Sequence, residues 1–222
     1  MSGETGWRLA AAMVLVALLA AAGPPPGGAP PQSNAPRPGN APPPDPNWPC
    51  QQIRIDRLSL ATMWGGPPLG KYLDDWQQNP KAAALARRIA QRRVPVAEAQ
   101  QEITEFAKAA GEQKKDALLA LVGGLFSLMD QERFAVIEGL DRFGARQKSY
   151  AADIRGEITA LHDAQDAAKP DPQKVQKLGD QIHWDTQVFA DRNSMISYAC
   201  FVPDEIEHRL FALAGTASNL LQ

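Results

Sequence analysis

Apolar side chains recur at intervals of three and four residues from position 79 to the end of the chain, which is the spacing of amphipathic helices. The dipeptide Asn79-Pro80 predicts a helix start, with asparagine as the cap and proline in the first helical position. This helix should run to about Arg92. A second helix should follow Val94-Pro95 and end at Gly111, so the two helices form a predicted hairpin.

The next apolar run, from Ala117 to Met129, is apolar on all sides and predicts the most buried helix of the protein. It is too short to span a membrane. Its Gly123-Gly124 pair either permits the close approach of another segment or breaks the helix.

A longer helical pattern follows from Asp130 to about Ala168, and the stretch KPDPQ (169–173) predicts a turn. The returning segment places apolar residues at near-heptad spacing, with Asp185 and Arg192 as polar members of the seam. We therefore expect a long antiparallel hairpin of coiled-coil character. The two polar residues should either pair with the facing helix or lie at its edge. The returning seam contains Val175, Leu178, Ile182, Phe189, Ile196 and Ala199.

The last predicted helix begins at Pro203, with Ile206, Leu210 and Leu213 facing inward. The predicted fold class is therefore all-α, a helical bundle within a single domain over residues 50–222. Glycine at positions such as 139, 144 and 156 weakens the long helix by about 1 kcal/mol each relative to alanine.

Two segments precede this domain. Residues 1–22 contain Arg8, an apolar run and three alanines, which predicts a signal peptide cleaved before Gly23, with an uncleaved anchor as the alternative. Residues 23–49 contain 12 of the 19 prolines, which favours a solvated, disordered linker with polyproline II character. This linker is either a spacer or a ligand for a proline-binding partner.

Cys50 and Cys200 are the only cysteines. Because a signal peptide implies an oxidising compartment, we predict a disulfide between them, with free thiols or an intermolecular bridge as alternatives. This bond would tie an N-terminal arm to the end of the returning helix. Ile53, Ile55, Leu58 and Leu60 partly alternate with charged residues in that arm, which predicts an extended segment lying on the core. Trp48 and Trp64 are predicted packing anchors.

The formal net charge of −2 over 222 residues gives no indication of nucleic-acid binding. One helix nevertheless concentrates cations on a single face, and this face is a candidate docking patch for an acidic partner or phospholipid headgroups. The alternative is a solvated face balanced by Glu98, Glu102 and Glu105. The candidate partner-binding residues are Lys81, Arg87, Arg88, Arg92 and Arg93.

The sequence contains few candidate metal-ligating or catalytic residues. Asp180 and His183, like Glu205 and His208, are one helical turn apart and make a weak metal-ligand candidate, with solvated helix charges as the alternative. A Cys200–His208 nucleophilic pair would require a free thiol. The sequence contains no zinc-protease, haem, P-loop or dinucleotide motif, so it predicts no catalytic residue and no cofactor.

These observations favour an exported, periplasmic or cell-envelope interaction protein without enzymatic activity, such as an adaptor, assembly factor or chaperone-like subunit. Its partner would be an envelope protein. A helical-bundle metal-binding protein or enzyme, and a binder of an apolar small molecule, remain the alternatives.

Overall fold

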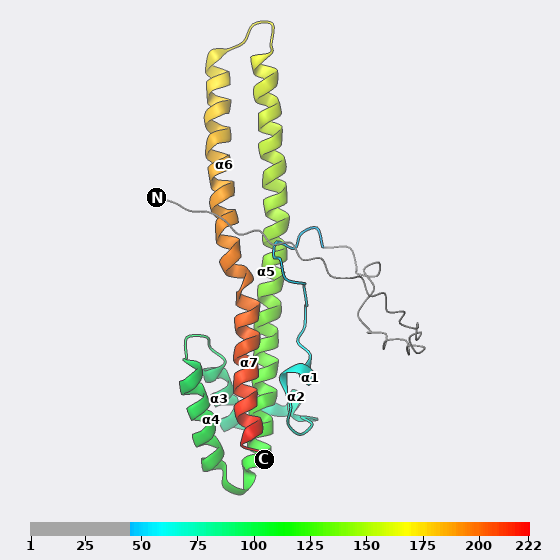
Figure 1. Cartoon of the computed structure of the whole chain (residues 1–222), viewed down its shortest axis with the longest axis vertical. Coiled ribbons are helices and arrows are strands. Elements are labelled where there is room, and N and C mark those ends of the chain that lie inside the picture. The colour runs from blue at the N-terminus through cyan, green and yellow to red at the C-terminus, as the bar shows by residue number, and fades with distance from the viewer. Residues whose placement is uncertain (1–44) are drawn as a thin grey trace, which may run out of the picture. The chain divides into compact units, whose positions relative to one another are not determined.

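A computed structural model describes residues 45–222. The predicted signal peptide and most of the predicted linker lie outside these residues. All regular elements within the described part are helical, as predicted, and no strand is present there (Figure 1). The short helices α1 to α4 surround one half of the long helix α5, and the other half of α5 forms an extended hairpin with α6.

We call the part of the bundle made by α1 to α4, α7 and the buried half of α5 the head. It begins with three short elements: α1 (Leu60–Met63), α2 (Tyr72–Asp75) and the 3₁₀ turn η1 (Trp76–Gln78). Helix α3 (Pro80–Ile89) then starts as predicted, because the Asn79 side chain accepts a hydrogen bond from the backbone N–H of Ala82 at 3.1 Å. It ends three residues before the predicted Arg92.

Helix α4 (Val96–Ala110) runs back beside α3, as predicted, but packs chiefly on α7 and α5, and it is followed by the 3₁₀ turn η2 (Gly111–Gln113). Gly111 has a φ of +52°, a left-handed conformation that favours glycine at the end of a helix. Ile103 is fully buried, whereas Val96 in the first turn is exposed.

Helix α5 (Lys114–Gln165) is a single helix of 52 residues, and the Gly123-Gly124 pair does not break it. Instead, a β-carbon on Gly123 would lie 2.0 Å from the backbone oxygen of Tyr72, and one on Gly124 would lie 2.7 Å from the Trp76 ring. The two glycines therefore permit α2 and η1 to pack directly against the buried apolar half of α5.

Helix α6 (Pro172–Cys200) returns antiparallel to α5, and α7 (Val202–Asn219) continues it into the head after a bend (Figure 1). The Asp171 side chain caps α6 by accepting the N–H of Gln173 at 2.9 Å. On α7, Ile206, Leu210 and Leu213 are buried against the head, as predicted.

The predicted disulfide is present: Cys50 and Cys200 are bonded, with their Cα atoms 5.7 Å apart. Arg133 reinforces the attachment of the arm, because its buried guanidinium donates to the Ile55 carbonyl at 2.5 Å and to the Glu207 carboxylate at 2.6 Å. Asn47 also packs closely on α5: its backbone oxygen would lie 1.7 Å from a β-carbon placed on Gly144.

The expectation that both arm isoleucines pack on the core is wrong. Ile53 is 85% exposed and Ile55 is 55% exposed. The arm is held by hydrogen bonds, ion pairs and the disulfide rather than by apolar packing. Its isoleucines therefore do not lie over a continuous apolar surface. Leu58 and Leu60 do pack against the core, and Trp64 is buried in it.

Candidate functional site

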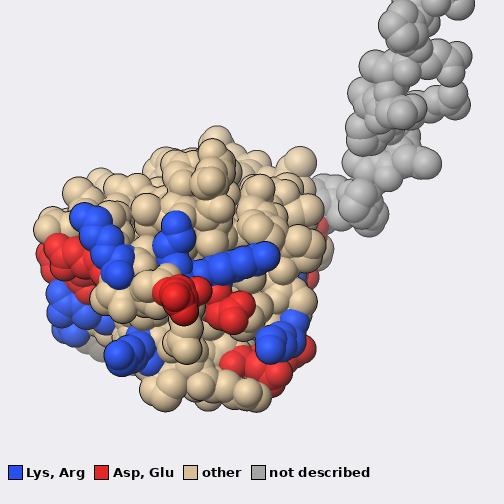
Figure 2. Space-filling view, turned by 90° about the horizontal axis from the view of Figure 1, so that it is seen from below, with Lys and Arg blue, Asp and Glu red and all other residues tan. Residues whose placement is uncertain are grey.

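The predicted cationic patch lies on α3 and the turn that follows, and most of its charge is engaged by other side chains. Arg88 pairs with Glu98 and Glu102, both at 2.9 Å, so the predicted balancing by α4 is present for this arginine. Arg92 pairs with Glu132 of α5 at 3.0 Å. Figure 2 shows the same mixture at the head end, where basic side chains lie beside acidic ones.

The remaining cations of the patch are arranged differently. The Arg87 guanidinium lies over the Trp76 ring, 5.1 Å from its centroid. Lys81 and Arg93 are exposed and form no ion pair with another described residue. Lys81 borders an open pocket of about 510 Å³ between the start of α3 and the end of α4. The patch thus offers two dispersed cations rather than a uniform basic surface.

The four metal-ligand candidates are not brought together. Asp180 and His183 are exposed near the tip of the hairpin, whereas Glu205 and His208 are exposed on α7 beside the head. About twenty helical residues separate the two pairs, which corresponds to roughly 30 Å along the helix axis. Within residues 45–222, no group of three potential metal-ligating side chains is present. Cys200 has no free thiol to pair with His208, because it is disulfide-bonded.

The hairpin seam contains a polar cluster that joins α5 to α6. Asp185 of α6 is only 8% exposed and accepts hydrogen bonds from the Tyr150 hydroxyl at 2.5 Å and from the Gln181 amide. Arg192 lies at the edge of the seam over the Tyr150 ring, 5.2 Å from its centroid. The prediction that the polar seam residues pair with the facing helix or lie at its edge is confirmed.

Glu157 of α5 places a second carboxyl group against Asp185. Its Oε2 atom is buried and has no hydrogen-bond partner among the described residues. Burial, followed by the charge of Asp185, raises the pKa of Glu157. The hydrogen bond from Tyr150, with that from Gln181, lowers the pKa of Asp185. Two facing carboxyl groups repel each other when both are ionised, which favours the protonated form of Glu157.

These opposite shifts predict that the hairpin is most stable at mildly acidic pH. The raised pKa of Glu157 gives a stabilisation that is complete below the ordinary glutamate pKa of about 4.3 and is lost as the pH rises through the folded-state value. The lowered pKa of Asp185 gives a stabilisation that is present above about pH 3.9 and is lost on further acidification.

Glu157→Gln should therefore raise the melting temperature at neutral pH and remove part of its decline above the ordinary glutamate pKa, because a glutamine amide can donate to Asp185 at every pH. Thermal unfolding followed by circular dichroism measures both effects. Asp153→Asn removes an exposed carboxylate one turn away and is the matched control, which should keep most of the wild-type decline. An equal decline in wild type and Glu157→Gln would contradict the prediction.

The outer side of α6 carries three large apolar side chains that are mostly exposed. Trp184 is 65% exposed, Met195 is 70% exposed and Tyr198 is 78% exposed. At 3.6 residues per turn, their positions fall within about 60° of one another on the helix, away from the seam. We refer to these three residues as the α6 apolar face.

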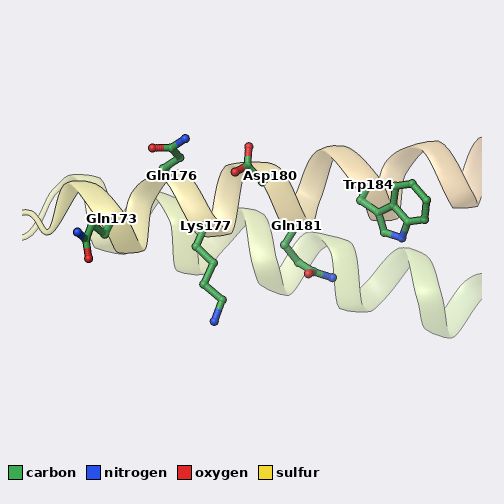
Figure 3. A pocket seen from close by; sticks show the side chains of 6 residues that line it. All are labelled: Gln173, Gln176, Lys177, Asp180, Gln181 and Trp184. Atoms are coloured by element: carbon green, nitrogen blue, oxygen red, sulfur yellow. The ribbon is translucent and has the colours of Figure 1, made fainter.

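A shallow groove of about 430 Å³ lies at the tip-proximal end of this face. Figure 3 shows the Trp184 indole at one end of the groove and Gln173 at the other, with Lys177 and Asp180 pointing to opposite sides of the helix. All its residues come from α6, and we call it the Trp184 groove. It is lined by Gln173, Gln176, Lys177, Asp180, Gln181 and Trp184.

The sequence analysis did not identify the α6 apolar face. The near-heptad seam accounts for the apolar residues of α6 that face α5, and Trp184, Met195 and Tyr198 are the large apolar residues left outside it. A helical projection of residues 172–200 would have placed them together on a second face. Such a projection is the sequence signal from which the α6 apolar face could have been predicted.

Comparisons with protein-family models, with curated proteins and with solved structures give no match. Of the helices within residues 45–222, none combines the length and the apolar character needed to cross a membrane.

Proposed function

We propose that this chain is an exported, non-enzymatic interaction protein of the cell envelope that presents the α6 apolar face to a protein partner. The observation that carries this proposal is the exposure of Trp184, Met195 and Tyr198 along one side of a hairpin that extends from the head. Large aromatic side chains are enriched at the centres of protein interfaces, where they contribute much of the binding energy.

The uneven distribution of buried side chains between the head and the hairpin supports this function. The large buried side chains gather in the head, whereas Ala164 and Asp185 are the buried residues in the segment 145–199, all of which the structure describes. The hairpin therefore has little core of its own, and its apolar side chains are available to another molecule. The head and the disulfide supply the stable base from which the hairpin extends.

Export is part of the proposal and has two supports. The apolar run in residues 9–22 has the composition of a signal peptide, and the Cys50–Cys200 disulfide suits an oxidising compartment such as the periplasm. The absence of catalytic motifs from the sequence and the dispersal of the candidate metal ligands are why a binding role is preferred to an enzymatic one.

The test uses a photocrosslinking amino acid placed in turn at Met195, Tyr198 and Ala190. Ala190 is also exposed on α6 but lies on another side of the helix, so it is the matched control. Irradiation of the native envelope should join Met195 and Tyr198 to the same protein, with several-fold lower yield from Ala190. Equal yields from the three positions, or no discrete product from any, would remove the support for this face.

A further inference from the structure

We propose that the cavity between the arm, α5 and the start of α7 binds a small aliphatic amine in its protonated form. The cavity has a volume of about 250 Å³, and we call it the arm cavity. Its walls come from residues 48–55 of the arm, from Arg133 and Ile137 of α5, and from the first turns of α7. The hydrocarbon chain of the ligand lies against isoleucine side chains, and its ammonium group lies against Asp204 and Glu207.

The apolar wall of the arm cavity gives the exposed isoleucines of the arm a role. Ile53 and Ile55, which are 85% and 55% exposed, line the cavity together with Ile137, which is 1% exposed. The two arm side chains thus border a hollow whose inner wall is apolar. A hydrocarbon chain in this hollow would remove apolar surface of all three isoleucines from water, which favours binding.

Two carboxylates with unpaired oxygen atoms line the same cavity. Asp204 is half-buried and forms no hydrogen bond or ion pair with another described residue. Glu207 receives both contacts from the Arg133 guanidinium on its Oε1 atom, each at 2.6 Å, so its Oε2 atom has no partner in the described part of the chain. Because residues three apart lie on one side of a helix, both carboxylates can approach a single cation.

The charges around the arm cavity favour a cation over an anion. Two carboxylates, Asp204 and Glu207, outnumber the one guanidinium of Arg133, which gives the lining a formal net charge of −1. The neighbouring wall of the arm is also acidic, because the single guanidinium of Arg54 contacts three carboxylates, those of Asp45, Asp56 and Asp141. An anionic ligand would meet uncompensated negative charge on both sides, whereas an ammonium group neutralises it.

The volume of the cavity limits the ligand to a short chain. Sites for drug-sized ligands occupy about 300–1,000 Å³, so the arm cavity suits a molecule of about the size of hexylamine. The binding energy that such small ligands reach corresponds to a dissociation constant on the order of millimolar. This inference does not depend on the proposed partner of the α6 apolar face, since it concerns another surface and is measured on the purified protein alone.

The experiment titrates three probes of equal chain length into the purified protein: hexylammonium, 1-hexanol and hexanoate. Labelled isoleucine methyl groups are followed by NMR, with Ile55 and Ile137 assigned through isoleucine-to-valine substitutions. Hexylammonium should shift both resonances in a saturable way and bind about five- to tenfold more tightly than hexanol, whereas hexanoate should bind more weakly than hexanol. The resonance of Ile158, which is partly exposed on α5 outside the cavity, should not change. Equal affinities for hexylammonium and hexanoate would overturn the proposal.

Two substitutions separate the charged part of the site from the apolar part. Asp204→Asn should weaken hexylammonium binding about fivefold and leave hexanol binding unchanged. The matched control Glu205→Gln removes an exposed carboxylate that does not line the cavity, and it should leave both affinities unchanged. Ile55→Ala should weaken both probes by a similar factor of about three.

None of the three substituted side chains belongs to the buried core, so the fold should persist, which the resonance of the buried Trp64 indole reports. Wild-type affinity of Asp204→Asn for hexylammonium would overturn the proposal. A titration in which Ile158 shifts as much as Ile55 would also overturn it, because the probe would then contact exposed apolar side chains without selecting the cavity.

Discussion

Replacing both cysteines by serine is expected to lower the free energy of unfolding by about 5 kcal/mol. The Cys50–Cys200 bond closes a loop of 150 residues, and the chain-entropy model assigns about 5 kcal/mol to restricting an unfolded loop of that length. Domains are typically stable by only about 5–15 kcal/mol, so this is among the largest single effects that the structure predicts. The melting temperature should fall by roughly 10–20 °C.

The measurement is chemical and thermal unfolding of the Cys50→Ser/Cys200→Ser variant beside the oxidised wild type. Reduced wild type should resemble the variant, and a reductant should have no effect on the variant itself, which separates the disulfide from the effect of the serines. A loss below about 1 kcal/mol would show that the unfolded chain already holds the two ends together.

The arm should remain near the head after the bond is removed, because other contacts also hold it. Arg133 still donates to Ile55 and Glu207, and Arg54 still pairs with Asp45 and Asp141. Hydrogen exchange should therefore accelerate in the arm before it accelerates in the buried half of α5. The bond acts mainly on the unfolded state, whereas the ion pairs act on the folded one.

The helices of this protein are largely predictable because their signals are local. Asn79 and Asp171 cap the helices that follow them, and the proline after each cap occupies the first turn. The spacing of apolar residues indicated the inward faces of α6 and α7, and the apolar run from Ala117 to Met129 indicated the buried half of α5. The disulfide followed from having two cysteines and a predicted export signal.

The contacts between distant elements were less predictable. The short turn before α6 requires antiparallel pairing with α5, but it does not specify which α5 residue faces Asp185. The meeting of Glu157 with Asp185 depends on that register. Glu132 of α5 likewise neutralises Arg92, whereas the sequence suggested only the acidic residues of α4.

The arm shows how a local pattern misleads. Ile53 and Ile55 alternate with charged residues, a spacing typical of an extended segment with one buried face. In the structure the polar neighbours Gln52 and Arg54 are half-buried and both isoleucines are exposed, while Arg133 of α5 donates to the Ile55 carbonyl. Arg133 belongs to α5, so the sequence of the arm itself gives no sign of this contact. Alternation alone therefore does not reveal which face of the arm points inward.

The proposed interaction surface and the head are both supported by α5. The buried half of α5 is enclosed by head helices, and its other half packs against α6. Glycine-to-alanine substitutions test the packing of the two halves of α5 separately. An added β-carbon lies against a backbone oxygen in one half and in open space in the other.

Gly123→Ala is expected to destabilise the head by about 3 kcal/mol or more, at the upper end of the usual cost of overpacking. Its β-carbon would lie 2.0 Å from the Tyr72 oxygen and 2.8 Å from the Tyr72 carbonyl carbon. Both atoms belong to the backbone, so no rotation of a side chain relieves the contact. The α2 segment would have to move away from α5, and Trp76 in the following turn would move with it.

Gly156→Ala, in the same helix, is expected to stabilise the protein. No atom lies within 4 Å of its added β-carbon, and alanine is favoured over glycine in a helix by about 1 kcal/mol. Urea unfolding should therefore shift to lower midpoint for Gly123→Ala and to higher midpoint for Gly156→Ala. Similar midpoints for the two variants would contradict the close packing of α2 on α5, because helix propensity acts in the same direction at both positions.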